Sequence, residues 1–167
     1  AENFLQEKAT AAILCRGAHA DLFPIDIGMA RDTKVPRYKV AYGTKNMAKG
    51  PAMTREEAVR ALETGIAVAE EKIAAGYQLM ATGEMGIGNT TTSSAMAAVF
   101  LNQPVPELTG RGAGLSSEGL ARKIAAIEKA IAINQPDPSD PIDVLAKVGG
   151  FDKIGRASCR ERVSAEV

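Results

Sequence analysis

The clearest pattern along the chain is an apolar stripe of helical period in its central third. Apolar residues recur every three or four positions from Ala58 to Ile73, behind the sequence Thr54-x-x-Glu57, and Gly76 follows. A Thr and a Glu at this spacing can satisfy the N–H groups at a helix start, and a glycine favours a helix end. The sequence therefore predicts an amphipathic helix between Thr54 and Gly76.

Four further segments carry helical period or helix-starting residues. We expect a helix within residues 5–20 and a capped helix over residues 89–100. A third begins after Ser116 or Ser117, and a shorter one runs from Asp140-Pro141 to Gly149-Gly150.

Two short apolar stretches, residues 21–28 and residues 77–82, are typical of strands. The second leads directly into a glycine-rich run and the helix after it. Helix, strand, glycine loop and helix in that order indicate an α/β fold, a Rossmann-like three-layer arrangement of a parallel sheet with flanking helices. The polar stretch 29–52 has no period, and loops of that length are usually functional or mobile.

Composition and charge narrow the class of protein. A chain of 167 residues suits one α/β domain, and 20 basic residues against 20 acidic ones favour neither nucleic acid nor a membrane surface as a partner. No apolar run is long enough to cross a bilayer, and the first residues lack the order of a signal peptide, so we expect a cytoplasmic protein. Cys15, Cys159 and His19 lack metal-ligand spacing, and we expect neither a metal nor a cofactor.

The candidate chemistry lies in the run Gly83-Glu84-Met85-Gly86-Ile87-Gly88-Asn89-Thr90-Thr91. Glycines between a strand and a helix let the backbone approach a ligand, and the helix start offers N–H groups to a phosphate. No Gly-Lys-Ser/Thr closes the run, and Thr91 stands where a dinucleotide fingerprint has its third glycine. The pattern alone leaves two interpretations open, an anion site and a tight turn without a ligand.

Charged residues near the run favour a nucleotide. Glu84 would repel a phosphate, so we expect it to face the sugar or the reacting base, where it could stabilise positive charge on the ribose or accept a proton. A second glycine turn, residues 110–114, carries Arg111 and precedes Lys123. Two glycine loops and a lysine could surround one phosphate, although a lone lysine is more often a solvated side chain.

Several collinear motifs resemble the nicotinate-nucleotide:dimethylbenzimidazole phosphoribosyltransferases. Besides residues 83–91, the resemblance rests on Gly110-Arg111-Gly112-Ala113-Gly114-Leu115, Ala130-Ile131-Ala132-Ile133-Asn134-Gln135-Pro136, and shorter matches between Ala12 and Asp152. It implies transfer of phosphoribose from nicotinate mononucleotide to 5,6-dimethylbenzimidazole or a related base, giving α-ribazole 5′-phosphate and nicotinate with inversion, a step of cobalamin assembly. It also implies a parallel α/β sheet, a smaller second domain and a homodimer.

The resemblance and the glycine loops together predict the site. Glu84 matches the family's active-site glutamate and Lys123 its phosphate-binding lysine. The predicted substrate-binding residues are Met85, Gly86, Ile87, Gly88, Asn89, Thr90, Gly110, Gly112, Ala113, Gly114 and Lys123. Two departures from the family pattern affect loop geometry: Thr92 stands where a proline is common and Gly114 where an asparagine can occur.

The resemblance also implies a fragment of a larger domain. The family's general base lies near the carboxyl end of longer chains, beyond the matching region, and N-terminal residues that help form the benzimidazole pocket are also absent. Residues 1–152 are expected to be the phosphoribosyltransferase α/β fragment. Residues 153–167 resemble a translated sequencing adapter, and we expect a non-native tail. The alternative function is a non-catalytic nucleotide-binding fragment, and a fragment that does not fold alone is a third possibility.

Overall fold

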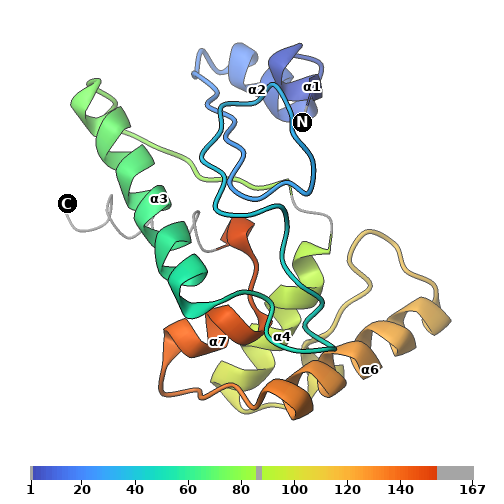
Figure 1. Ribbon diagram of the computed structural model, residues 1–167. Coiled ribbons are helices and arrows are strands. Elements are labelled where there is room, and N and C mark those ends of the chain that lie inside the picture. Colours follow the sequence, from blue (N-terminus) through green and yellow to red (C-terminus); the bar gives the residue numbers. More distant parts are fainter. Residues whose placement is uncertain (1, 86–87, 154–167) are drawn as a thin grey trace. The chain divides into compact units, whose positions relative to one another are not determined.

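The computed structural model describes residues 2–85 and 88–153, and the chain forms two compact units, Ala1–Gly43 and Thr44–Val167. Figure 1 shows the helices of both units along the chain. No helix among the described residues is long and apolar enough to cross a membrane.

The first unit starts with two short helices, α1 (Glu2–Leu5) and α2 (Thr10–Gly17), rather than the single helix predicted within residues 5–20. The backbone between them turns at Glu7, which has a φ of 55°. A left-handed residue cannot continue a right-handed helix, so the periodic pattern is broken there.

The first unit contains a buried ion pair. Lys39 Nζ lies 2.7 Å from Asp26 Oδ2, with both side chains 2% exposed, and it also donates to the carbonyl oxygen of Met29 at 2.5 Å. The Asp26 N–H donates to the Pro36 carbonyl at 2.8 Å, and the Tyr38 N–H donates to the Asp26 carbonyl at 3.0 Å. Residues 26–39 therefore form a loop whose two ends are joined by backbone hydrogen bonds and by the buried Asp26–Lys39 ion pair.

All regular elements of the second unit are helices over its described residues, and most of them begin where the sequence predicts. Its helices are α3 (Arg55–Ala74), α4 (Asn89–Leu101), α5 (Val105–Leu108), α6 (Ser117–Asn134) and α7 (Pro141–Val148). Thr54 and Glu57 form the predicted capping box of α3, the Ser116 side chain caps α6, and the Asp140 side chain caps α7. The short α5 was not predicted.

The core of the second unit forms where α4, α5, α6 and α7 meet. Ile127, Val144 and Val148 are fully buried in it, together with Ala95 and Ala130. Alanines at the contacts allow the helices to approach closely, and the larger apolar side chains fill the space between them. This packing holds α4 and α6, the two helices that follow the glycine loops.

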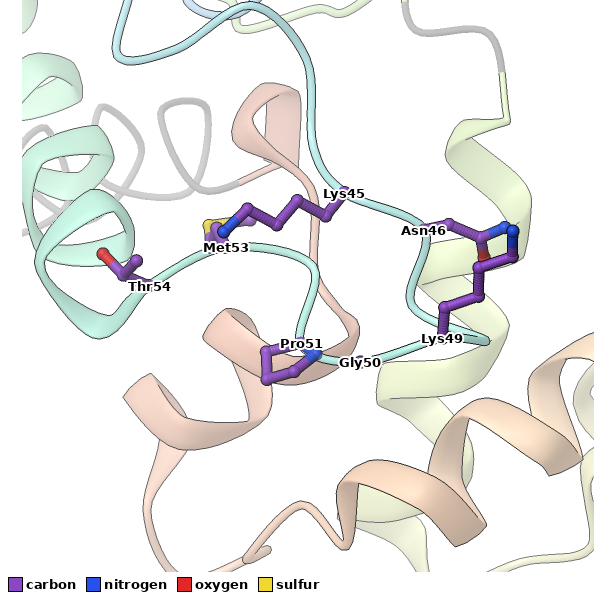
Figure 2. A pocket seen from close by; sticks show the side chains of 7 residues that line it. All are labelled: Lys45, Asn46, Lys49, Gly50, Pro51, Met53 and Thr54. Atoms are coloured by element: carbon purple, nitrogen blue, oxygen red, sulfur yellow. The ribbon is translucent and has the colours of Figure 1, made fainter.

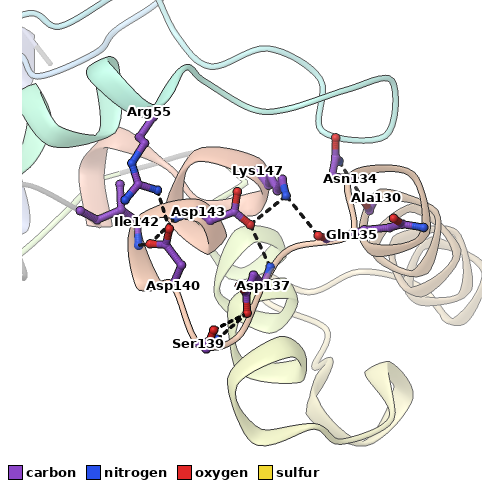
Figure 3. A network of polar contacts seen from close by, with 10 residues as sticks. All are labelled: Arg55, Ala130, Asn134, Gln135, Asp137, Ser139, Asp140, Ile142, Asp143 and Lys147. Carbon is purple, nitrogen blue, oxygen red and sulfur yellow. Dashed lines mark hydrogen bonds and ion pairs between the residues drawn. The ribbon is translucent and has the colours of Figure 1, made fainter.

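Polar contacts join the ends of the helices around this core (Figure 3). Asn134 Nδ2, at the end of α6, donates to the Met47 carbonyl at 2.7 Å, and Arg55 on α3 pairs with Asp140 before α7 at 2.6 Å. Lys147 lies 2.8 Å from Asp143 one turn away on α7. The Asn134 side chain thereby holds the segment before α3, at Met47, against the end of α6.

The predicted parallel sheet is not present in the part of the chain that the structure describes. Residues 21–28 form a single parallel bridge, between Asp26 and Arg37, and residues 77–82 form no strand. The Tyr77 N–H donates back to the Lys72 carbonyl and so completes the end of α3. A strand is stable only when a neighbour accepts its N–H groups, and no described segment lies beside residues 78–82 as a strand.

Candidate functional site

The N-terminus of α4 differs from those of the other long helices of the second unit. Side chains cap α3, α6 and α7, whereas α4 starts at Gly88, which has a φ of 84° and no side-chain cap. The sequence prediction of a capped α4 is therefore wrong. The first N–H groups of a helix have no partner within it, so the start of α4 can present such groups to an anion.

Lys123 joins the two glycine loops. Its side chain comes from the first half of α6, and the residue is only 8% exposed. Its Nζ donates to Thr90 Oγ1 at 2.9 Å and to the Gly110 carbonyl oxygen at 3.0 Å. Residues of the first loop, of the second loop and of α6 therefore meet at one ammonium group, as a shared phosphate site would require.

The second glycine loop approaches α4 very closely at Gly112. A Cβ atom added there would lie 2.7 Å from Thr90 Oγ1 and 3.7 Å from Lys123 Nζ. Gly112 also has a φ of 57°, which a side chain disfavours. Gly114 has a φ of 98°, but a Cβ atom added to it would meet nothing within 4 Å, so of these two glycines only Gly112 is held by contact as well as by backbone conformation.

The other cation of the second loop, Arg111, is used within that loop. Its guanidinium donates to the Leu115 carbonyl at 2.8 Å and to the Ser117 hydroxyl at 3.0 Å. These bonds tie the loop to the start of α6. Lys123 is therefore the cation that the structure places between the loops, and Arg111 supports the backbone around it.

The remaining predicted residues lie on exposed backbone. Glu84 and Met85 are exposed on the segment before α4, and Ala113 is exposed in the second loop. Gly86 and Ile87 lie outside the described residues. The structure thus brings Thr90, Gly110, Gly112 and Lys123 together, whereas Glu84 is exposed and is not among the residues that meet at Lys123.

Sequence reasoning missed a contact at the other side of the α4 start. Asn89 Nδ2 donates to Asp152 Oδ2, and Lys153 Nζ donates to Asn89 Oδ1 at 2.5 Å. Asp152 follows α7 and is 63 positions from Asn89, so no local pattern could have revealed the pair. Both polar atoms of the Asn89 side chain are consequently hydrogen-bonded within the protein. Asn89 can therefore offer an anion its backbone N–H at the start of α4.

A separate concavity of about 460 Å³ lies in the segment before α3 (Figure 2). Its lining residues are Lys45, Asn46, Lys49, Gly50, Pro51, Met53 and Thr54. The two lysine side chains extend in different directions, so their ammonium groups do not converge on one point. No residue of the predicted site lines it.

Comparison with known proteins identifies the family of the chain. The chain matches the family described as "Phosphoribosyltransferase" over residues 1–159. It belongs to this family. Among its relatives, the nicotinate-nucleotide–dimethylbenzimidazole phosphoribosyltransferases of Geobacter sulfurreducens and Alkaliphilus metalliredigens are 53% and 52% identical over 159 residues, each covering 93% of this chain. The resemblance seen in the sequence is thereby confirmed.

Solved structures of this phosphoribosyltransferase family also match. CobT from Thermus thermophilus is 39% identical, with a TM-score of 0.87 over 98% of this chain and 50% of that one. The chain spans about half the length of the curated relatives it matches, 45% and 46% of the two named above. The chain therefore has a fold similar to about half of a longer phosphoribosyltransferase.

Proposed function

We propose that this chain supplies the nucleotide-binding part of an enzyme that transfers phosphoribose from nicotinate mononucleotide to 5,6-dimethylbenzimidazole or a related base. One observation carries the proposal: Lys123, a buried residue, bonds through its ammonium group to the Thr90 hydroxyl in the first turn of α4 and to the Gly110 carbonyl in the second glycine loop. The names of the relatives support the choice of substrates.

The hydrogen bonding around Lys123 suits a phosphate. An ammonium group has three N–H donors, and two of them are used by Thr90 and Gly110, which leaves one for a ligand. The Thr90 oxygen accepts from Lys123, so its own hydrogen points elsewhere and can be donated to a phosphoryl oxygen. With the uncapped start of α4, the site offers backbone, hydroxyl and ammonium donors to one anion.

Glu84 completes the proposed chemistry. The bond from the anomeric carbon to the nicotinate nitrogen breaks, and its electron pair neutralises the pyridinium ring as nicotinate leaves. A benzimidazole nitrogen attacks the opposite face of the same carbon and inverts it, and the proton on the second ring nitrogen goes to a base. Positive charge develops on the ribose meanwhile, and a carboxylate such as Glu84 beside the anomeric centre stabilises it.

The same proposal includes a parallel sheet and a homodimer in the full-length enzyme. Leu79 and Met85 are 86% and 73% exposed in a segment without helix or strand, and burying them against further protein would remove their apolar surface from water. We propose that residues 77–82 join a parallel sheet in the full-length family member, which is a cytoplasmic homodimer that uses no metal or cofactor.

Calorimetric titration of the 167-residue chain with nicotinate mononucleotide tests the phosphate site. We expect binding, and a loss of affinity of at least tenfold in Lys123→Ala, the effect of removing one charge-assisted hydrogen bond. Lys129→Ala removes an exposed lysine of the same helix and is expected to leave affinity unchanged. Nicotinic acid riboside, which lacks the phosphate, should bind both variants equally.

No heat from a folded sample, or unchanged affinity in Lys123→Ala, would contradict the proposal. The alternative is a non-catalytic nucleotide-binding fragment, which is favoured by the chain's match to only about half of each relative. Release of nicotinate when 5,6-dimethylbenzimidazole is added to the nucleotide complex excludes that alternative.

A further inference from the structure

The first turn of α4 is held on two sides by side chains that do not belong to it. Thr90 is bonded to Lys123, and Asn89 is bonded to Asp152 and to Lys153. Consecutive residues of an α-helix project about 100° apart around the axis, so these two anchors act on different faces of the same turn. Of the two anchors, Lys123 alone belongs to the phosphate site.

The Asn89 anchor extends into the turn itself. The Thr92 and Ser93 hydroxyls both donate to the Asn89 carbonyl oxygen at 3.0 Å, and the Ser93 hydroxyl also reaches Asn89 Oδ1 at 3.3 Å. Asn89 therefore has its side-chain amide, its side-chain oxygen and its carbonyl engaged. Rotation of its side chain would break the contacts of Asn89 with Ser93 Oγ, Asp152 and Lys153, whereas the hydroxyl bonds to its carbonyl oxygen would remain.

Asp152 reaches Asn89 because the segment after α7 is fixed in the core. Phe151 is 4% exposed, and Gly150 is buried beside it. A Cβ atom at Gly150 would lie 2.7 Å from Asp152 Oδ1 and 3.5 Å from Thr92 Oγ1. The Asp152 carboxylate can therefore lie close to the backbone of Gly150 only because this residue has no side chain. The position of Asp152 is thus set by the buried residues that precede it.

We propose that Asp152 is a positioning residue for the phosphate site: its carboxylate fixes Asn89 and with it the direction of the backbone N–H groups at the start of α4. The proposal rests on the proposed function, because it assumes that these groups face the nucleotide. A carboxylate near a bound phosphate costs electrostatic energy, and this cost is offset by the charge-assisted hydrogen bond from the Asn89 amide and by the positive end of the α4 dipole.

Titration with nicotinate mononucleotide tests the role in binding. Asp152→Ala is expected to lower affinity about tenfold, and Asp152→Asn, which keeps an oxygen that can accept from Asn89, is expected to stay within about threefold of the unchanged chain. In Asn89→Ala/Asp152→Ala the losses should be less than additive, because both changes remove the same contact. Asp137→Ala, an exposed aspartate in the loop before α7, is the matched control and should bind normally.

Native-state hydrogen exchange tests the anchoring without a ligand. In Asp152→Ala the N–H groups of Thr91–Ser94 should exchange at least tenfold faster, while the second half of α4 and the thermal midpoint stay the same. Wild-type affinity together with wild-type exchange in Asp152→Ala overturns the proposal, as does a strictly additive double variant. If the unchanged chain gives no heat with the nucleotide, the proposed function fails, and exchange alone decides whether Asp152 holds the first turn.

Discussion

At the scale of single residues, the site depends on one close approach between two loops. Thr90 Oγ1 occupies the space that a side chain at Gly112 would need, and Lys123 lies against both. The glycine is therefore required for two separable reasons, its positive φ and the neighbouring hydroxyl. Gly114 shares the first reason and lacks the second.

Gly112→Ala and Gly114→Ala should separate these two effects. Both changes put a methyl group on left-handed backbone, which costs about 1–2 kcal/mol of unfolding free energy. Gly112→Ala should lose more stability than that, and it should weaken nicotinate mononucleotide binding, because its methyl group displaces Thr90 from Lys123. Urea unfolding and calorimetric titration measure both quantities. Equal stability and equal affinity in the two variants would show that the contact with Thr90 has no consequence.

The residues of the site could be predicted where a short stretch of sequence contains the pattern that indicates them. The glycines of each loop lie a few positions apart in the sequence, and Lys123 follows the second loop, so spacing and resemblance were sufficient to group them. The Asn89–Asp152 and Asp26–Lys39 contacts were not predicted. Each pair joins two ordinary polar residues, and only tertiary packing brings them together.

At the scale of elements, helices were predicted well and strands were not. The starts of α3, α6 and α7 follow from Thr54, Ser116 and Asp140, whose side chains bond to N–H groups two or three positions away. A strand depends instead on a neighbour that can be far along the chain or outside it. Residues 77–82 have the composition of a strand, but no described strand lies beside them.

The link between α3 and α7 should make the second unit sensitive to acid. A hydrogen bond from Arg55 is the main cause that lowers the pKa of Asp140 below its ordinary value of 3.8. A carboxylate with a lowered pKa stabilises the fold above its unfolded pKa, and the stabilisation is lost as pH falls through the folded pKa. Asp140→Asn should therefore be less stable than the unchanged chain at pH 7, and the difference should shrink below pH 4.

Chemical unfolding at a series of pH values measures this difference. Glu63→Gln removes an exposed carboxylate elsewhere on α3 and serves as the control. Arg55→Met removes the hydrogen bond from the other side and should flatten the pH dependence in the same way as Asp140→Asn. A constant difference between Asp140→Asn and the unchanged chain from pH 3 to pH 7 would contradict the assignment.

At the scale of the whole molecule, the two units are stabilised differently. The second unit has an apolar core that includes Ile127, Val144 and Val148, whereas the first buries Asp26, Ala12 and Val35. Every described residue that meets at Lys123 belongs to the second unit. The phosphate site proposed here is therefore a property of the second unit, and the first unit should be separable from phosphate binding.

Asp26→Asn tests that separation. The change leaves the Lys39 ammonium buried without a carboxylate, which costs about 3–5 kcal/mol. Hydrogen exchange at the Tyr38 and Val40 N–H groups should accelerate, while exchange within α4 and α6 and the affinity for nicotinate mononucleotide stay the same. Asp32→Asn, which breaks the exposed pair with Arg37, should change neither, because exposed ion pairs contribute little. If Asp26→Asn abolished nucleotide binding while α4 and α6 kept their protection, the first unit would have to contribute directly to the site.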